Sequence, residues 1–360
     1  MSPDLAVDKH VRYFKTALNM LPSPMVQLDS NRMTIAHLSL VGLAALGRLE
    51  SAFTEAERQG MIEWIYEQQV HPATSNSTSN SSSSSSLGIC GFRGGSLFGP
   101  HNSGTYEASN LGNVASTYSA LSSLLLLGDD LGRVNRRAII GALRYLQLPS
   151  GSFAPHLGTT ESDPRFIYCA CAVSCILGDW SGVDQGAATR YIVGCTGYDG
   201  GLSQAPLQES HGGHLYCCVA SLALMGQLDA LPDRRRTLQW ALLRLNQGYQ
   251  GRIGKLPDVC YSFWVGASVE ILGGHEMVDP SGLEVFTLSC EAKYGGVAKC
   301  PGNHPDPLHA ALGIVGFAFF RDELPRMEPM LLLPEELVRA KVPVENNAVT
   351  TGVDNSWPSF

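Results

Sequence analysis

The sequence repeats itself at intervals of 45 to 50 residues. Each repeat has a glycine-rich turn and then a motif in which a tyrosine precedes small and apolar residues. The aligned tyrosines are Tyr118, Tyr168, Tyr216 and Tyr261, and His309 takes the tyrosine's place in a fifth copy. Glycines recur in step with them, at positions 151, 200–201, 251 and 295–296. A period of this length is typical of chains built from repeated supersecondary units, each too small to bury its apolar face alone.

Each period has room for two helices of about a dozen residues and their turns. The first helix of a pair, with charged residues on one side only, is predicted at Arg136–Gln147, Gln185–Val193 and Arg234–Asn246. The second is apolar nearly all round, as at Tyr216–Met225 and Tyr261–Leu272, which indicates burial on two sides. No alternating run predicts a strand of useful length. We therefore expect an all-α domain of helical hairpins, and the period alone does not distinguish an open solenoid from a closed ring.

The composition agrees with two layers of buried helices. Only 16% of residues are charged, whereas about 25% is usual. The net charge of -8 argues against a nucleic-acid binder with a broadly basic surface. The apolar run Ala310–Phe320 is too short to span a bilayer, and Met1–His10 lacks the apolar stretch of a secretion signal. We expect a cytoplasmic protein that is not an integral membrane protein, with most of its ten cysteines reduced and buried.

Two segments differ from the rest in composition. Thr74–Ser86 is almost entirely Ser, Asn and Thr, which predicts a flexible insertion in a loop. The residues from about Val342 to Phe360 are polar and uneven, which predicts a loosely held end. We therefore expect one domain over residues 1–330, interrupted by the Ser-rich insertion at about 74–86, and a C-terminal tail over residues 331–360.

The densest group of chemically active residues surrounds the start of one predicted inner helix. Asp258 and Cys260 bracket that start, so both side chains can reach one ion, and His309 begins the next inner helix one period later. Asp, Cys and His together suit zinc, and three protein ligands leave a fourth position open, as in catalytic zinc sites. Taken alone, Asp-x-Cys more often means a helix-capping aspartate and a buried cysteine, and both interpretations stay open.

Cations gather just upstream of that pair in a chain that has few of them. Arg252 and Lys255 lie three residues apart, His211 has the equivalent place one repeat earlier, and Arg165 one repeat before that. If the repeats close into a ring, these side chains meet at one end of the inner helices, where they can hold a phosphate or diphosphate by charge-assisted hydrogen bonds. A solvated loop with scattered charges is the alternative, and the spacing alone favours it.

Three motifs together resemble the β subunits of protein prenyltransferases. They are the stretch GRIGKLPDVCYSFW at residues 251–264, Ser-His-Gly-Gly at 210–213 and Asp-Pro-Leu-His at 306–309. The resemblance covers about residues 10 to 320 apart from the Ser-rich insertion. It implies an α-α barrel, a toroid of helical hairpins around a hydrophobic funnel.

The resemblance also implies roles for individual residues. The family's zinc ligands match Asp258, Cys260 and His309. The positions around the isoprenoid diphosphate match His211, Arg252, Lys255 and Tyr261. The positions that line the cavity for isoprenoid and peptide match Arg165, Tyr168 and Trp264.

Two further positions imply which member of the family the chain resembles. Thr34 takes the place of a tryptophan that floors the funnel in farnesyltransferases, and the small side chain leaves room for a 20-carbon isoprenoid. Lys299 takes the place of an aspartate that helps to hold magnesium in farnesyltransferases, and its charge would itself neutralise the diphosphate. The sequence therefore resembles type I geranylgeranyltransferases, which need zinc but not that magnesium.

The activity that this resemblance implies is transfer of a geranylgeranyl group from its diphosphate to the cysteine of a C-terminal CaaX box, with X often Leu, forming a thioether. The acceptors would be CaaX proteins such as Rho-type small GTPases, and the chain would act as the β subunit of a heterodimer with an α subunit. Lys299 would join the three zinc ligands as a catalytic residue, because it would stabilise the departing diphosphate.

Other functions fit the residues less well. The β subunits of farnesyltransferase and of the Rab-specific geranylgeranyltransferase are close alternatives, which Thr34 and Lys299 disfavour. A terpene cyclase needs an acidic motif, and the one Asp pair, Asp129-Asp130, follows a leucine run as a helix-end turn would. A non-catalytic α-α barrel that only binds a ligand gives no reason for Asp258, Cys260 and His309 to recur at equivalent helix ends.

Overall fold

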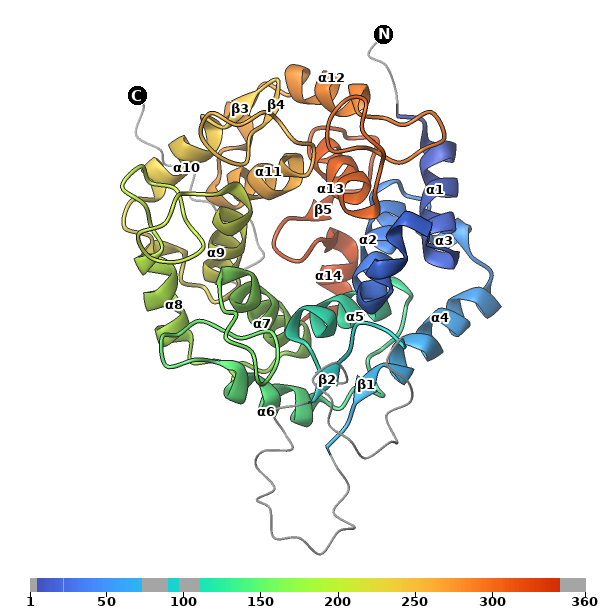
Figure 1. The fold of residues 1–360 in the computed structure, drawn as a ribbon, viewed down its shortest axis with the longest axis horizontal. Coiled ribbons are helices and arrows are strands. Elements are labelled where there is room, and N and C mark those ends of the chain that lie inside the picture. The colour runs from blue at the N-terminus through green and yellow to red at the C-terminus, as the bar shows by residue number, and fades with distance from the viewer. Residues whose placement is uncertain (1–4, 22, 73–89, 97–110, 344–360) are drawn as a thin grey trace, which may run out of the picture.

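The computed structural model describes residues 5–21, 23–72, 90–96 and 111–343, and in it the helices are arranged as a ring (Figure 1). The Ser-rich insertion Thr74–Ser86 and the tail from residue 344 onward lie outside the described residues, so the predictions made for them stay predictions.

Among the described residues, six mostly apolar helices form the inner wall of the ring. They are α2 (Arg32–Ala45), α5 (Val114–Leu126), α7 (Pro164–Leu177), α9 (Gly212–Leu224), α11 (Tyr261–Leu272) and α13 (Pro307–Ala318). Each packs against the next in this order, and α13 packs against α2, so the ring closes. The choice between solenoid and barrel is thus decided, and the predicted α-α barrel is confirmed.

The outer layer is made of the more polar helices that precede the inner ones. They are α1 (Val7–Asn19), α4 (Glu55–Glu67), α6 (Arg136–Leu146), α8 (Gln185–Gly194), α10 (Arg234–Leu242) and α12 (Ser281–Ser289). Short elements complete the described chain: helices α3 (Leu49–Ala52) and α14 (Glu335–Lys341), 3-10 turns at Ser23–Asn31, Leu228–Ala230 and His275–Met277, and strands β1 (Gln69–Val70), β2 (Gly91–Phe92), β3 (Leu245–Asn246), β4 (Gly248–Tyr249), β5 (Met327–Glu328) and β6 (Leu333–Pro334).

Two predicted helix bounds differ from the structure by four residues, each for a local reason, and three others differ by one residue. Helix α10 ends at Leu242 rather than Asn246, because the chain turns there into the β3–β4 ribbon, with Gln247 in the left-handed region at φ +61°. Helix α9 begins at Gly212, four residues before Tyr216, because His211 caps it by accepting a hydrogen bond from the backbone N–H of Gly213.

The inner helices pack closely because small residues lie between them. Gly316 of α13 lies against Ser262 of α11, where a Cβ would be 2.4 Å from the Ser262 carbonyl carbon. Nearly every inner-helix side chain is buried, including those of α7 except Arg165. Burying one such Val, Leu, Ile or Phe contributes about 1.5–3 kcal/mol, so the two buried faces of the inner layer are the main source of the barrel's stability.

A C-terminal segment reaches into the middle of the ring (Figure 1). Its loop Pro329–Leu332 joins β5 to β6, and we call it the floor loop. The hydroxyls of three repeat tyrosines, Tyr118, Tyr168 and Tyr216, donate to its carbonyl oxygens over 2.8 to 3.0 Å. Residues 331–343, which the predicted domain limits left in the tail, therefore pack against the ring, and the limits themselves stay a prediction.

Candidate active site

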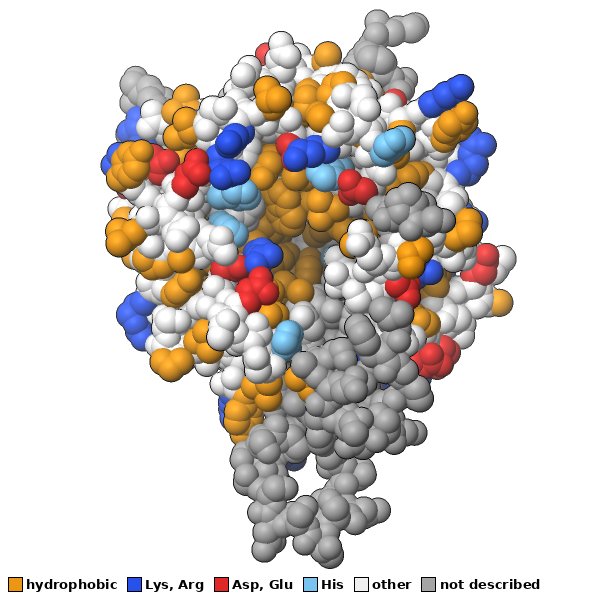
Figure 2. All heavy atoms as spheres, viewed as in Figure 1, with side chains coloured by type: hydrophobic (Ala, Val, Ile, Leu, Met, Phe, Trp, Pro, Cys, Tyr) orange, Lys and Arg blue, Asp and Glu red, His pale blue; other side chains and the backbone are white. Residues whose placement is uncertain are grey.

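The loops that precede α9, α11 and α13 lie side by side on one face of the ring. The Gly212 N–H donates to the Gly251 carbonyl over 2.8 Å, and the Val259 N–H donates to the Lys299 carbonyl over 2.9 Å. Figure 2 shows an apolar hollow in the middle of this face, with Lys, Arg and His side chains along part of its rim. The closed ring of helices thus brings the chemically active residues of three repeats to the mouth of this hollow.

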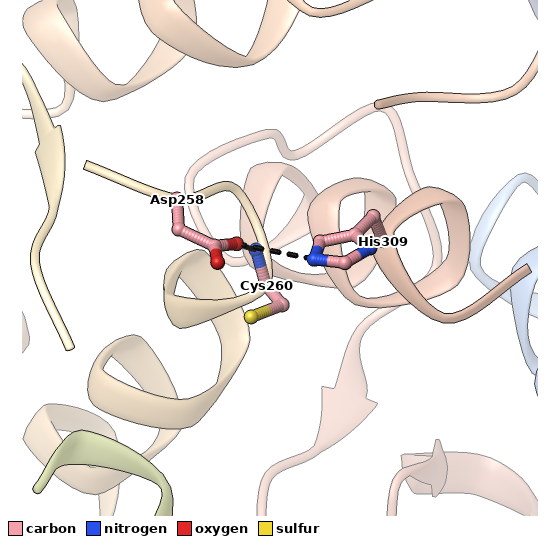
Figure 3. Close-up of side chains that lie close together, drawn as sticks. All are labelled: Asp258, Cys260 and His309. Carbon is pink, nitrogen blue, oxygen red and sulfur yellow. Dashed lines mark hydrogen bonds and ion pairs between the residues drawn. The ribbon is translucent and has the colours of Figure 1, made fainter. Parts of the chain in front are cut away.

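Asp258, Cys260 and His309 meet at this mouth (Figure 3). One potential ligand atom of each lies within 4.8 Å of the others. The Nε2 atom of His309 is 3.3 Å from Oδ1 of Asp258, which also accepts a 3.0 Å hydrogen bond from the Cys260 backbone N–H. That tight turn places the carboxylate and the thiol on the same side of the chain just before α11. The interpretation as a helix cap and a buried cysteine does not account for the third residue.

Asp306, for which the sequence predicted no role, orients His309. Its Oδ2 atom lies 2.6 Å from Nδ1 of His309, while its Oδ1 accepts from the backbone N–H groups of Leu308 and His309 and so caps α13. With Nδ1 bound to the carboxylate, Nε2 is turned toward Asp258. Histidines that ligate metals typically have such a carboxylate partner on the other nitrogen. An aspartate three residues before a histidine at a helix start was the available sequence signal.

The electrostatics of this group favour a positive charge at its centre. Burial lowers the pKa of His309, but hydrogen bonds to Asp258 and Asp306 outweigh burial and raise it to about 9. Burial raises the pKa of the Cys260 thiol, and the Asp258 carboxylate raises it further. The raised pKa values of His309 and Cys260 both reflect the negative charge of the neighbouring carboxylates, which a bound metal cation would also neutralise. A carboxylate oxygen, a thiol sulfur and an oriented imidazole nitrogen are donors that fit zinc.

His211 and Tyr261 form a second pair at the mouth. The Nδ1 atom of His211 accepts from the Gly213 N–H over 3.0 Å, so the neutral ring carries its proton on Nε2. That nitrogen lies 3.1 Å from the Tyr261 hydroxyl oxygen and donates to it, which leaves the phenolic O–H directed at another acceptor. Burial lowers the pKa of His211, and the Arg252 charge lowers it further.

The predicted cations lie around this pair in different settings. Arg252 forms an ion pair with Glu209 over 3.3 Å, and Lys255 is exposed in the same loop. The Nζ atom of Lys299 lies 3.6 Å from Oδ2 of Asp258, which links the cationic rim to the candidate metal ligands. Arg165 is held at the start of α7 by a 2.6 Å contact with the buried Asp163. Their roles toward a diphosphate stay predictions.

The predicted cavity residues differ in depth. Trp264 packs on Tyr216 with ring centroids 5.1 Å apart, and Thr34 is half-buried near the start of α2. Tyr168 is 6% exposed and lies deeper, since its hydroxyl donates to the floor loop and its oxygen lies 3.0 Å from that of Tyr118 and 3.1 Å from that of Tyr216. The repeat showed these tyrosines in the sequence, but not that they bind a C-terminal loop. Their contacts with isoprenoid or peptide stay predictions.

Comparison with known proteins identifies the family. A model of the prenyltransferase alpha-alpha toroid domain matches residues 5–337. The β subunit of geranylgeranyl transferase type-1 from Arabidopsis thaliana is 35% identical over 347 residues, which are 92% of this chain and 90% of the relative. The chain belongs to the protein prenyltransferase β-subunit family. The resemblance stated from the sequence is thereby confirmed.

Other members of the prenyltransferase family show where the chain lies within it. The type-1 β subunit from Dictyostelium discoideum is 35% identical over 326 residues, 87% of this chain and 90% of the relative. The farnesyltransferase β subunit of Schizosaccharomyces pombe is 29% identical over 335 residues, 88% of this chain and 78% of the relative. A solved structure, "Candida albicans protein geranylgeranyltransferase-I complexed with GGPP", shares the fold with a TM-score of 0.81 at 24% identity, covering 94% of this chain and 98% of that one.

The prenyltransferase barrel has two further properties that bear on the predictions. Its ten cysteines are free thiols, and nine of them are buried. In the part of the chain that the structure describes, no helix has both the length and the apolar character needed to cross a bilayer.

Proposed function

We propose that this chain is the catalytic β subunit of a protein geranylgeranyltransferase type I, and that it works beside an α subunit. It transfers a geranylgeranyl group from geranylgeranyl diphosphate to the cysteine of a C-terminal CaaX box. The observation that carries the proposal is the meeting of Asp258, Cys260 and His309 within 4.8 Å at the mouth of an apolar hollow. The names of the two type-1 relatives support the choice of donor and of subunit.

Asp258, Cys260 and His309 would hold one zinc ion, with Asp306 fixing the imidazole of His309 in place. When bound, zinc would lower the pKa of a substrate thiol at the open position, so that the thiol would be deprotonated at neutral pH. The chain's own contribution is to hold three donors on two rigid helix starts and to leave the apolar side of the site open to the lipid. Magnesium is not required in this proposal, because Lys299 provides positive charge where the diphosphate leaves.

The cationic rim would bind the diphosphate and stabilise the charge that grows on it as the C1–O bond breaks. Tyr261 donates its free O–H, and its oxygen is already held by His211. Arg252, Lys255 and Lys299 add positive charge. Removing one preorganised donor of this kind costs about 3 kcal/mol in the transition state, or roughly 100-fold in rate.

The apolar wall would bind the isoprenoid. Each buried CH₂ contributes about 0.8 kcal/mol, so a 20-carbon chain gains ample binding energy from a wall that includes Trp264. Thr34 decides chain length by volume rather than by charge, because a small side chain near the start of α2 leaves the hollow deep enough for the longer lipid.

The decisive experiment is to co-express the chain with a prenyltransferase α subunit and to let 15- and 20-carbon diphosphates compete for a peptide that ends in a CaaX box with Leu last. The proposal expects a thioether-linked 20-carbon product and about one zinc per β subunit by elemental analysis. Preference for the 15-carbon donor would place the chain with the farnesyltransferases, and full activity without bound metal would overturn the proposed zinc site.

A further inference from the structure

The first outer helix of the barrel is fastened to the last repeat by a buried histidine. His10 of α1 is fully buried, and its Nε2 atom lies 2.7 Å from Oε1 of Glu291. Its Nδ1 atom accepts a 3.0 Å hydrogen bond from the Gly296 backbone N–H, 286 residues away in the sequence. Because an N–H occupies Nδ1, the neutral ring carries its proton on Nε2 and donates it to Glu291. Both nitrogens of the ring are therefore used to hold one loop.

That loop, residues 291–306, runs between α12 and α13 and lies beside α1 (Figure 1). Two glycines let the helix approach it closely. A Cβ on Gly295, at φ +98°, would lie 2.2 Å from the Lys9 carbonyl oxygen, and a Cβ on Gly296, at φ +80°, would lie 2.8 Å from the Tyr13 ring. Glycines recur at this place in the repeats as part of a turn, and here Gly295 and Gly296 also let α1 pack directly against the loop.

The far side of the same loop contacts the candidate metal site in two places. At its middle, the Lys299 carbonyl accepts from the N–H of Val259, the residue between Asp258 and Cys260. At its end, Asp306 binds the ring of His309. The loop therefore carries the carboxylate that orients one candidate ligand, His309, and is hydrogen-bonded to the segment that carries the other two.

Tyr13 continues the contact from α1 toward Asp306. Its ring lies against Gly296, and the same glycine position faces Pro305, the residue before Asp306. Burial raises the pKa of the Tyr13 hydroxyl, and the negative charge of Asp306 raises it further. The contacts thus run without a gap from α1 through the loop to the imidazole of His309.

We propose that His10 is a positioning residue for the candidate metal site. By fixing the loop of residues 291–306 against α1, His10 sets the distance between the two ligands that precede α11 and the ligand carried by α13. This inference rests on the metal site of the proposed function. In this proposal α1 contributes to the metal site although it lies in the outer layer, on the far side of the loop from the ligands.

The test uses the full chain purified with its α subunit and three variants. His10→Phe keeps a ring of similar size but removes both hydrogen bonds, and His10→Gln keeps one donor and one acceptor. His37→Phe is the matched control, because His37 is equally buried in α2 and its Nε2 has no hydrogen-bond partner among the described residues. Zinc affinity is measured by competition with a chromophoric chelator, and ligand geometry by the visible absorption of the Co²⁺-loaded protein.

The proposal expects His10→Phe to weaken zinc binding by at least 10-fold and to alter the Co²⁺ spectrum, His10→Gln to recover part of both, and His37→Phe to behave as the wild type. If the wild type binds one Co²⁺ and His10→Phe has the same zinc affinity and the same Co²⁺ spectrum, the inference is overturned and the proposed zinc site remains. A wild type that binds neither metal would overturn the site and the inference together. If His10→Phe does not fold, Glu291→Ala removes the contact with Nε2 of His10 from the loop side and must also weaken zinc binding and alter the Co²⁺ spectrum, while the Gly296 contact with Nδ1 remains.

Discussion

The Oδ2 atom of Asp306 lies 2.6 Å from Nδ1 of His309, while the other oxygen of the same carboxylate caps the helix on which His309 stands. One side chain therefore begins α13 and turns its histidine toward Asp258. The two tasks can be separated by substitution, because an amide oxygen can still cap a helix, whereas it lacks the charge that holds the imidazole.

Asp306→Asn is expected to weaken zinc binding by about 10- to 100-fold, the usual effect of losing a carboxylate partner of a ligating histidine. The melting temperature should change little, because the amide oxygen can still accept from the Leu308 and His309 N–H groups. Asp306→Ala should lose about 1 kcal/mol of stability in addition, since the cap is lost. Chelator competition and thermal unfolding measure the two effects, and equal zinc affinity in Asp306→Asn and wild type would contradict the assignment.

Cys260→Ala is expected to abolish transfer while leaving binding of the isoprenoid diphosphate largely intact, because the thiol serves the metal and not the lipid. Binding is measured with a fluorescent diphosphate analogue and turnover with a CaaX peptide. Cys175→Ala is the control, since Cys175 is similarly buried but lies in α7 away from the mouth. Residual activity near the wild-type level in Cys260→Ala would remove it from the site.

Thr34→Trp is expected to shift donor preference toward the 15-carbon diphosphate, because the larger side chain fills volume near the start of α2 that the fourth isoprene unit needs. The measured quantity is the ratio of kcat/KM for the two donors. Thr34→Ser changes the side chain's volume little and should keep the wild-type ratio. A Trp variant with an unchanged ratio would show that Thr34 does not set the length.

Glu328 is expected to make stability depend on pH. The side chain is 3% exposed beneath the floor loop, and burial raises its pKa from 4.5 to about 7. Below about pH 4.5 the carboxyl is protonated in both folded and unfolded states, and its contribution is fully present. As pH rises toward 7, the unfolded chain releases the proton and the folded chain keeps it, so the free energy of unfolding falls and then levels off above about pH 7.

Glu328→Gln mimics the neutral carboxyl and keeps an acceptor for the Leu331 N–H, which lies 2.7 Å from Oε2 in the wild type. The variant should therefore match the wild type near pH 4.5 and exceed it at pH 8, by roughly 3 kcal/mol at most. Denaturant unfolding at the two pH values measures this difference. Glu336→Gln, at an exposed position of α14, should show no such dependence, and a Glu328→Gln curve parallel to the wild type would contradict the burial effect.

The site was partly readable from the sequence, because the donor types suit zinc and the surrounding motifs resemble those of a family with a zinc site, although Asp-x-Cys alone left a helix cap as the alternative. Asp258, Cys260 and His309 follow from the chemistry of zinc ligands and from the repeat, which puts equivalent positions at equivalent places in space. Asp306 was missed because an aspartate before a helix has an ordinary explanation as a cap, and its second oxygen gains a meaning only once the imidazole is placed beside it.

By itself the sequence determined the helical hairpins, their inner and outer layers and the identity of the three candidate ligands. The spacing of apolar residues along a helix is a local property of the sequence, and each repeat shows it independently of the others. Only the tertiary structure decided that α13 packs on α2, that the floor loop is held by three tyrosines, and that His10 holds the loop beside the ligands. These contacts join residues more than 100 positions apart in the sequence, and ring closure also depends on the small rotation between successive repeats, about which a periodic pattern carries no information.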